Sequence, residues 1–395
     1  MDDGKWRALG LVAVAELLAM SLWFSASAVG PELVARWGLT GTEEALLTSA
    51  VQVGFVVGAL VSAALTLADT VQPRYLFAGS SVAGAVFTVG VALGDAFVPA
   101  LALRFLTGVA LAGVYPPGMK LAAGWFEGGR GIAIGTVVGA LTIGSALPHL
   151  LRAVGGIGDP FPVLYGAAGL AVVGGVLALR VRPGPYQAPA APFDPAATAR
   201  VIRDRPTLLA DLGYFGHMWE LYAVWTWIPA YTLAATGDPE LAALVAFGTI
   251  AVGGVGSLAA GALADRIGRT TVTSGSMVVS GSACLIAIPA FGWAVVALVP
   301  FLLLWGVVIV ADSAQFSACV TELAEESYVG TALTLQTAVG FLLTIASIQL
   351  TPVVAATMGW QWAFAPLAVG PALGTLAMLR LRRLPAAAKL AGGRG

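Results

Sequence analysis

Long apolar runs separated by short polar segments make up most of the chain. Each run holds roughly 20 residues, the length that an α-helix needs to cross about 30 Å of hydrocarbon. The runs are solidly apolar rather than alternating, which predicts helices and excludes a membrane β-barrel. The predicted spans are residues 6–30, 45–67, 75–94, 97–121, 131–154, 161–181, 207–234, 241–263, 271–291, 293–319, 328–351 and 360–380. The pattern therefore predicts an all-α membrane protein with about twelve transmembrane helices.

The second half of the chain repeats the first in the same order. Glu, Leu, Ala and Trp recur at the same offsets in residues 16–23 (ELLAMSLW) and 220–227 (ELYAVWTW). Further matching pairs are residues 58–69 with 254–265 and residues 98–103 with 299–304. Repeats of this kind place a substrate site at their interface, near the middle of the membrane.

This repeat predicts two six-helix bundles in parallel orientation, at residues 1–181 and 207–395. Residues 182–206 between them are rich in Pro and Ala and carry several Arg residues. They are the expected cytoplasmic linker, with a short surface helix near residues 196–204.

Composition and charge agree with a membrane protein. Hydrophobic residues make up 58% of the chain and charged residues 10%, whereas soluble domains hold about 25% charged residues. The mean hydropathy is +0.88. Most of the 20 basic residues fall on one side if the N-terminus lies inside, with Arg36 and Arg152 outside. We therefore expect cytoplasmic N- and C-termini in a multi-pass protein of the cell inner membrane, and no nucleic-acid partner.

Two further readings of the sequence are less favoured. Residues 25–28 (SASA) resemble a signal-peptide cleavage site, but the repeat partner of this segment lies in mid-chain, where no signal peptide can be. Cys284 and Cys319 fall inside predicted spans, so we expect neither a disulfide framework nor a metal site. No cofactor is expected.

Glu16 and Glu220 each lie midway along a predicted span. A charged side chain at that depth costs at least about 2.5–3.5 kcal/mol, so its repeated presence indicates function. At 100° per residue, one stripe of each helix carries further candidate residues. The candidates for substrate binding and proton coupling are Glu16, Met20, Trp23 and Ser27 on the first helix, and His217, Glu220, Trp227 and Tyr231 on the seventh.

These stripes predict a central cavity with two carboxylates, a histidine and aromatic walls. Trp219, Tyr222, Trp225 and Tyr231 could instead face lipid or the membrane interface, and His217 could be a packing residue rather than a proton relay. Loss of water around a carboxyl group favours its protonated form, which suits proton coupling. We expect Glu220→Gln to abolish uptake driven by a pH gradient and to leave exchange intact.

Other polar residues lie nearer the ends of the predicted spans. Asp312, Gln315 and Gln336 are candidates for lining a cytoplasmic exit, and Asp211 is expected at the membrane interface. His149 and Arg152 could attract an anion at the outer end of the fifth helix or could anchor a loop.

The loop at residues 261–269 (GALADRIGR) strongly resembles the GxLADRxGRR signature of the major facilitator superfamily. The resemblance implies the fold of that superfamily and a cytoplasmic gating latch formed by Asp265, Arg266, Gly268 and Arg269. The matching loop of the first half keeps Asp69 and Arg74, the expected counterpart of this latch, but has lost both glycines of the signature. A turn with solvated charges is the alternative for both loops.

Residues 104–108 (RFLTG) resemble the RxxQG motif of the fourth helix in that superfamily, with Thr in place of Gln. The resemblance links Arg104 to proton transfer, although small residues nearby also allow a packing role. A buried Arg needs a carboxylate or exposed carbonyl groups, and Glu16 is the first expected partner. Residues 144–149 (GSALPH) replace the GPxxGG motif of proton-coupled drug exporters, which argues against a typical member of that group.

Together these features favour a secondary active transporter that moves a small organic solute by alternating access, as a proton-coupled symporter. A proton-independent facilitator or an exporter is the alternative. An enzyme is not expected, because no cluster of nucleophile and base is present, and a non-transporting sensor would need a partner domain. The expected partners are the solute, protons and the lipid bilayer, with the chain as a monomer. Acidic and aromatic residues suit a neutral or cationic solute, unless the glutamates are protonated or paired with Arg104.

Overall fold

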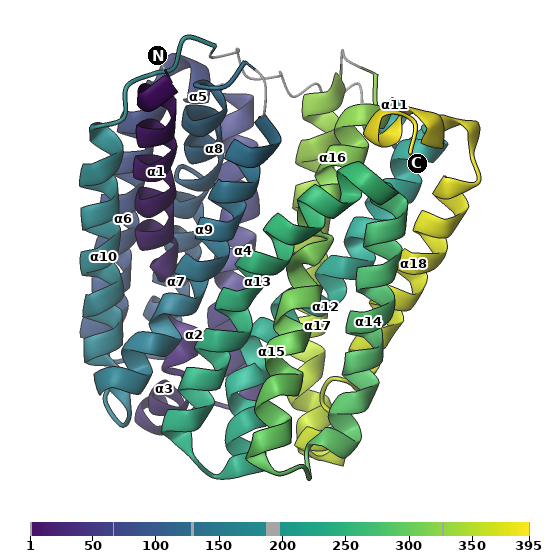
Figure 1. Ribbon diagram of the computed structural model, residues 1–395. Helices are drawn as coiled ribbons and strands as arrows, with labels where there is room; N and C mark the ends of the chain where they lie inside the picture. The colour runs from purple at the N-terminus through teal and green to yellow at the C-terminus, as the bar shows by residue number, and fades with distance from the viewer. Residues whose placement is uncertain (1, 66, 128–129, 187–197, 326–327, 395) are drawn as a thin grey trace. The chain divides into compact units, whose positions relative to one another are not determined.

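The computed structural model describes residues 2–65, 67–127, 130–186, 198–325 and 328–394, and the regular structure in these ranges is helical (Figure 1). The chain forms two compact units. Unit 1 comprises Met1–Ala190 and Ile228–Gly254, and unit 2 comprises Ala191–Trp227 and Val255–Gly395. The division of the chain at residues 182–206 into two six-helix bundles stays a prediction.

Unit 1 is built from long helices and several short turns. Its elements are α1 (Asp2–Ala19), a 3-10 turn (Met20–Leu22), α2 (Ser25–Ala28), α3 (Gly30–Trp37), α4 (Gly41–Ala64), α5 (Leu67–Thr70), α6 (Pro73–Leu93), α7 (Phe97–Leu111), α8 (Tyr115–Ala123), α9 (Arg130–Leu151), a π-helical turn (Arg152–Gly156) and α10 (Phe161–Leu179). Helix α4 packs along α7, and α10 packs along both α6 and α1. The first predicted span is therefore interrupted after Ala19 rather than continuous.

Unit 2 contains most of the remaining helices. The elements that follow in the chain are α11 (Thr198–Arg203), α12 (Arg205–Thr236), α13 (Pro239–Ile267), α14 (Arg269–Ala290), α15 (Val295–Ala311), α16 (Ser313–Leu323), α17 (Val329–Met358), two 3-10 turns (Trp360–Trp362 and Ala365–Ala368), α18 (Val369–Arg382) and a 3-10 segment (Pro385–Gly392). The end of α12 and the first part of α13 belong to unit 1. Helix α11 lies where a short linker helix is predicted; residues 196 and 197 fall outside the described ranges.

Among the described residues, ten helical segments are long and apolar enough to cross a membrane. The chain is therefore a multi-pass membrane protein. The predicted spans at 6–30 and 207–234 are not among the ten, and they stay predictions. Helix α1 ends at Ala19, whereas α12 has 32 residues but contains Asp211, His217 and Glu220. The two helices with mid-span glutamates are thus the two predicted spans that lie outside the set of ten.

Glycine allows the closest helix contact in unit 1. A Cβ atom at Gly54 of α4 would lie 2.0 Å from the carbonyl oxygen of Phe105, and one at Gly108 of α7 would lie 2.1 Å from that of Val51. Small residues let membrane helices approach in this way. Arg104 lies one turn before Gly108, so the same contact brings it close to α4.

Candidate functional site

Glu220 lies on α12 and is enclosed by other helices of unit 2. Its side chain is 1% exposed. Ser280 Oγ of α14 donates a hydrogen bond to Oε2 at 2.8 Å, and Trp305 Nε1 of α15 donates one to Oε1 at 2.9 Å. Cys284 Sγ donates a third to Oε1 at 3.3 Å. Three donors from two neighbouring helices therefore hold this carboxylate in a fixed position.

His217 lies one turn before Glu220 and pairs with a second carboxylate. Its Nδ1 is 2.9 Å from Asp312 Oδ1, at the junction of α15 and α16, and both side chains are buried. The imidazole ring also packs against the ring of Phe316, with 5.6 Å between centroids. The predicted exit residue Asp312 is thus the partner of the predicted relay residue His217.

A second buried polar group joins α12 to α17. Gln336 Nε2 donates a hydrogen bond to Asp211 Oδ1 at 2.9 Å, and Gln336 Oε1 accepts one from Ser317 Oγ at 3.2 Å. Asp211 is 6% exposed, so it is enclosed by protein, and its expected place at the level of the membrane interface stays a prediction. The carboxylate is buried because an amide from the neighbouring helix supplies its hydrogen bond.

Glu16 on α1 has a different environment from that of Glu220. It is fully buried in unit 1, and neither carboxyl oxygen has a hydrogen-bond partner among the described residues. Gly118 of α8 makes room for it, because a Cβ atom there would lie 2.4 Å from Glu16 Oε2. The two glutamates therefore occupy matching positions in the sequence but not matching surroundings.

Arg104 of α7 is fully buried and binds the segment that follows α1. Its Nη1 donates to Leu22 O at 3.0 Å and to Ser25 Oγ at 3.1 Å, and its Nη2 donates to Trp23 O at 2.5 Å. Its Nε donates to Leu47 O of α4 at 3.3 Å. Glu16, the first expected partner, is not bound, because the interruption after α1 exposes carbonyl groups that take its place.

Arg104 and Trp305 occupy equivalent positions in the repeat, since residues 98–103 align with 299–304. Arg104 donates hydrogen bonds to backbone carbonyl groups of the segment that follows α1. Trp305 donates a hydrogen bond to the Glu220 carboxylate itself. The same position thus supplies a donor in both units, but only the second donor reaches the carboxylate.

The remaining residues of the predicted stripes are mostly buried. Met20, Trp23, Trp227 and Tyr231 are at most 3% exposed, and the hydroxyl of the half-buried Ser27 lies 2.5 Å from that of Thr48. Trp227 Nε1 donates to Ile348 O at 2.9 Å. Tyr222, Trp225 and Tyr231 are at most 7% exposed, which argues against a lipid-facing position for these three, whereas Trp219 is half-buried.

The signature predicted as a loop at residues 261–269 is mostly helical: residues 261–267 are the end of α13, Gly268 is the link, and Arg269 begins α14. An ion pair connects Arg269 to α16. Arg269 donates to both carboxyl oxygens of Glu322 on α16, at 2.6 and 3.0 Å, and to Gln315 Oε1 at 2.7 Å. Asp265 lies farther away, 3.9 Å from Arg269 Nη2, and its side chain is 71% exposed. Gly268 has a φ angle of +98°, which glycine adopts without steric cost. Arg269 therefore ties the start of α14 to α16.

The other latch candidates make fewer contacts. Arg266 is exposed. Arg74 donates to Gln72 Oε1 at 3.1 Å and stacks on the ring of Tyr75. The side chain of Asp69 lies outside the described residues.

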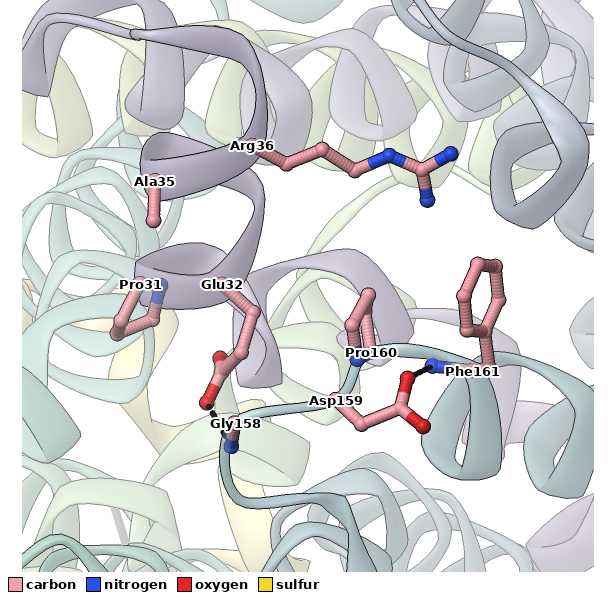
Figure 2. A pocket seen from close by; sticks show the side chains of 8 residues that line it. All are labelled: Pro31, Glu32, Ala35, Arg36, Gly158, Asp159, Pro160 and Phe161. Atoms are coloured by element: carbon pink, nitrogen blue, oxygen red, sulfur yellow. Dashed lines mark hydrogen bonds between the residues drawn. The ribbon is translucent and has the colours of Figure 1, made fainter.

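An open pocket of about 670 Å³ lies in unit 1 between α3 and the loop before α10. Figure 2 shows its polar lining: Glu32 accepts from the backbone N–H of Gly158 at 3.2 Å, and Asp159 accepts from that of Phe161 at 3.0 Å. Arg152 pairs with Glu32 at 2.9 Å beneath the surface. Arg152 therefore anchors a loop rather than presenting a free positive charge.

In the part of the chain that the structure describes, no group of three or more His, Cys, Asp or Glu side chains could hold a metal ion.

Comparison with known families decides the identity of the chain. The family model described as Major Facilitator Superfamily matches residues 12–348 and, in a second match, residues 210–395. The chain belongs to the Major Facilitator Superfamily. Membership in this superfamily makes it a transporter of small molecules rather than an enzyme, as the loop at 261–269 indicates. Comparison with curated proteins gave no significant match.

Solved structures of this superfamily share the fold. A mutant of the nucleoside transporter NupG has a TM-score of 0.74 at 14% identity, and the match covers 95% of this chain and 99% of that one. A bacterial homologue of the human lysosomal transporter Spinster, inward-facing and occupied, has a TM-score of 0.72 at 13% identity, covering 96% and 97% of the two chains. At these identities the likeness concerns the fold.

Several residues at the site carry no signal that sequence patterns could detect. Ser280, Cys284 and Trp305 are ordinary residues of membrane helices, and only their position beside Glu220 gives them a role. Gln52 of α4 does carry a signal, as an amide within an apolar span. It is fully buried, and neither amide atom has a hydrogen-bond partner among the described residues.

Proposed function

We propose that this superfamily member is a proton-coupled secondary transporter that moves a small organic solute by alternating access. Its twelve spans would comprise the ten apolar segments together with α1 and α12, and both termini would lie in the cytoplasm. The positive-inside distribution of Lys and Arg supports this orientation. A monomer in the cell inner membrane is the form we propose.

The observation that carries the proposal is the contrast between Glu16 and Glu220. A buried carboxylate without a donor is far more costly when ionised than when protonated. Glu16 is in that position, whereas Glu220 accepts three hydrogen bonds. We therefore assign the exchangeable proton to Glu16, and to Glu220 a role in positioning, together with Trp305. This reverses the assignment favoured by the sequence.

The other predicted site residues receive roles consistent with their contacts. His217 and Asp312 would relay protons or polarise the site beside Glu220, and Arg104 would hold the interrupted first helix in place. The aromatic side chains of Trp23, Trp227 and Tyr231 would contact the solute once the site opens. We also propose that Met20 and Ser27 line the site, and that Gln315 and Gln336 contribute to the cytoplasmic exit.

We propose that the residues of the 261–269 signature and their counterparts in the first half form the cytoplasmic gating latch. Arg269, bound to Glu322 and Gln315, is its best-supported member. Asp265, Arg266 and Gly268 complete the latch of the second half, and Asp69 and Arg74 are the proposed counterpart in the first.

The test begins with a thermal-shift screen of purified protein against metabolites and drugs at two pH values. Nucleosides belong in the panel because NupG is a nucleoside transporter of the same fold. Aromatic and acidic groups favour neutral and cationic solutes over anions. A ligand found in this way is then used for uptake into proteoliposomes.

Uptake separates the two glutamates. We expect Glu16→Gln to abolish accumulation driven by a pH gradient while solute exchange persists, because a permanently neutral side chain cannot release a proton. Glu220→Gln is expected to weaken ligand binding at both pH values, because the amide presents an N–H₂ group to donors that require an acceptor. Normal gradient-driven accumulation by Glu16→Gln would disprove the assignment and would place the exchangeable proton on another group. A wild-type protein that equilibrates the solute but shows no gradient-driven accumulation would favour a proton-independent facilitator.

A further inference from the structure

The segment that follows α18 is docked on unit 2 by two buried side chains. Leu390 is fully buried and Ala387 is 6% exposed, whereas Lys389 between them is exposed. The segment Pro385–Gly392 packs against α16. Figure 1 shows it coiled beside α11, at the end of unit 2 where α16 also lies.

Two hydrogen bonds connect this segment to the proposed latch. The backbone N–H of Ala391 donates to Glu322 Oε2 at 3.0 Å, and this oxygen also accepts from Arg269 Nε. Arg394 Nη1 donates to the backbone carbonyl of Asp265. The segment therefore contacts both the partner of Arg269 and the last turn of α13, which carries Asp265.

Ala391 adopts a conformation that disfavours alanine. Its φ and ψ angles are +46° and 41°, in the left-handed region, where a Cβ atom is sterically costly. Among the described residues it is the only non-glycine residue with a positive φ angle. This conformation persists because the docked Leu390 and the bond to Glu322 hold the backbone there.

We propose that the segment Pro385–Arg394 is a strap that restrains the latch. By binding Glu322 and the Asp265 carbonyl, it holds α16, the end of α13 and the start of α14 in one arrangement. The latch must change its contacts when the cytoplasmic side opens, so the strap has to loosen first. This inference rests on the proposed function of the loop as a gating latch, and it adds a regulating element to it.

Hydrogen–deuterium exchange on the full-length protein in lipid nanodiscs tests the strap without any substrate. Leu390→Ala should increase exchange about tenfold or more in both residues 385–394 and residues 262–270, because the anchor is lost. Ala391→Gly should slow exchange in both segments by a few-fold, since glycine removes the steric cost. Lys389→Ala is the matched control and should change neither.

The result that overturns the proposal is faster exchange in residues 385–394 of Leu390→Ala with unchanged exchange in residues 262–270. The segment would then be docked but would not restrain the loop. Unchanged exchange in both segments would also overturn it, because Leu390 would not be an anchor. The readout does not depend on transport, so failure of the proton assignment to Glu16 would leave this test intact.

Discussion

At the scale of single residues, the buried polar groups of this transporter differ in how completely they are bonded. Glu220, His217 and Asp211 each have a polar partner on another helix. Glu16 and Gln52 have none among the described residues. Fully bonded groups hold a structure in place, whereas unbonded ones are available to a proton, a water molecule or a solute. Unit 2 has such a group as well, because neither amide atom of Gln349 has a hydrogen-bond partner among the described residues. The contrast therefore concerns the two glutamates rather than the two units.

Arg104 provides a test of stability at this scale. Arg104→Lys should reduce stability by roughly 2–3 kcal/mol, because one ammonium group cannot reach four acceptors spread over α4 and the segment after α1. The expected measurement is a lower apparent melting temperature in detergent. Arg382→Lys, at an exposed position of α18, is the control and should leave it unchanged. Equal melting temperatures for both variants would show that the carbonyl contacts contribute little.

The importance of single residues was partly predictable from the sequence. The cost of burying charge identifies Glu16, Glu220 and Arg104 without a structure. Their partners could not be identified, because Ser280 and Trp305 lie 60 and 85 residues from Glu220 in the chain. The Arg104–Glu16 pairing failed for a related reason: hydropathy does not reveal that the first helix is interrupted and offers carbonyl groups.

At the scale of elements, the interruption after α1 and the close packing of α4 against α7 together make the binding site of the Arg104 side chain. Helix α1 stops at Ala19, and Arg104 reaches the segment beyond it from α7, which is held against α4 by Gly54 and Gly108. The length of the apolar runs predicted the ten helical segments, since helices that cross a membrane must be long and apolar. It could not locate the break, because the residues from Met20 to Ala28 are as apolar as a regular helix requires.

The close contact between α4 and α7 predicts a specific effect of added volume. Gly108→Ala should lower stability by about 1–3 kcal/mol, because the new Cβ atom would overlap the Val51 carbonyl group and force the helices apart. Gly79→Ala in α6 is the matched control: a Cβ atom there meets nothing within 4 Å, and alanine favours the helix. Thermal unfolding of both variants should show a decrease for the first only. Equal stability of the two would contradict tight packing at Gly108.

At the scale of the whole molecule, the superfamily fold was recognisable from the loop at 261–269 alone, and the family match confirms it. The internal repeat was visible as well. The different surroundings of Glu16 and Glu220 could not be predicted. The repeat aligns the two glutamates, but the residues that pack around each of them come from other helices and differ between the two halves.

The proposed orientation can be checked by labelling single cysteines in intact cells. Glu127→Cys, after the fourth predicted span, should react only with reagents that cross the membrane, whereas Asp159→Cys, after the fifth, should react with impermeant reagents. Both positions are exposed. The native Cys284 and Cys319 are buried and should give little background. The opposite labelling pattern would place the termini outside.

The hydrogen bond from Trp305 to Glu220 also makes the Trp305 indole N–H a spectroscopic probe of the Glu220 carboxylate. An indole N–H resonance responds to the charge on its acceptor, and the chain has 11 tryptophans, so a nitrogen-15 spectrum of these side chains would be sparse enough to assign. The Trp305 signal should shift whenever the Glu220 carboxylate gains a proton or turns away. Protonation at the centre of the second unit could then be followed at equilibrium, without a transported solute and without attaching a label.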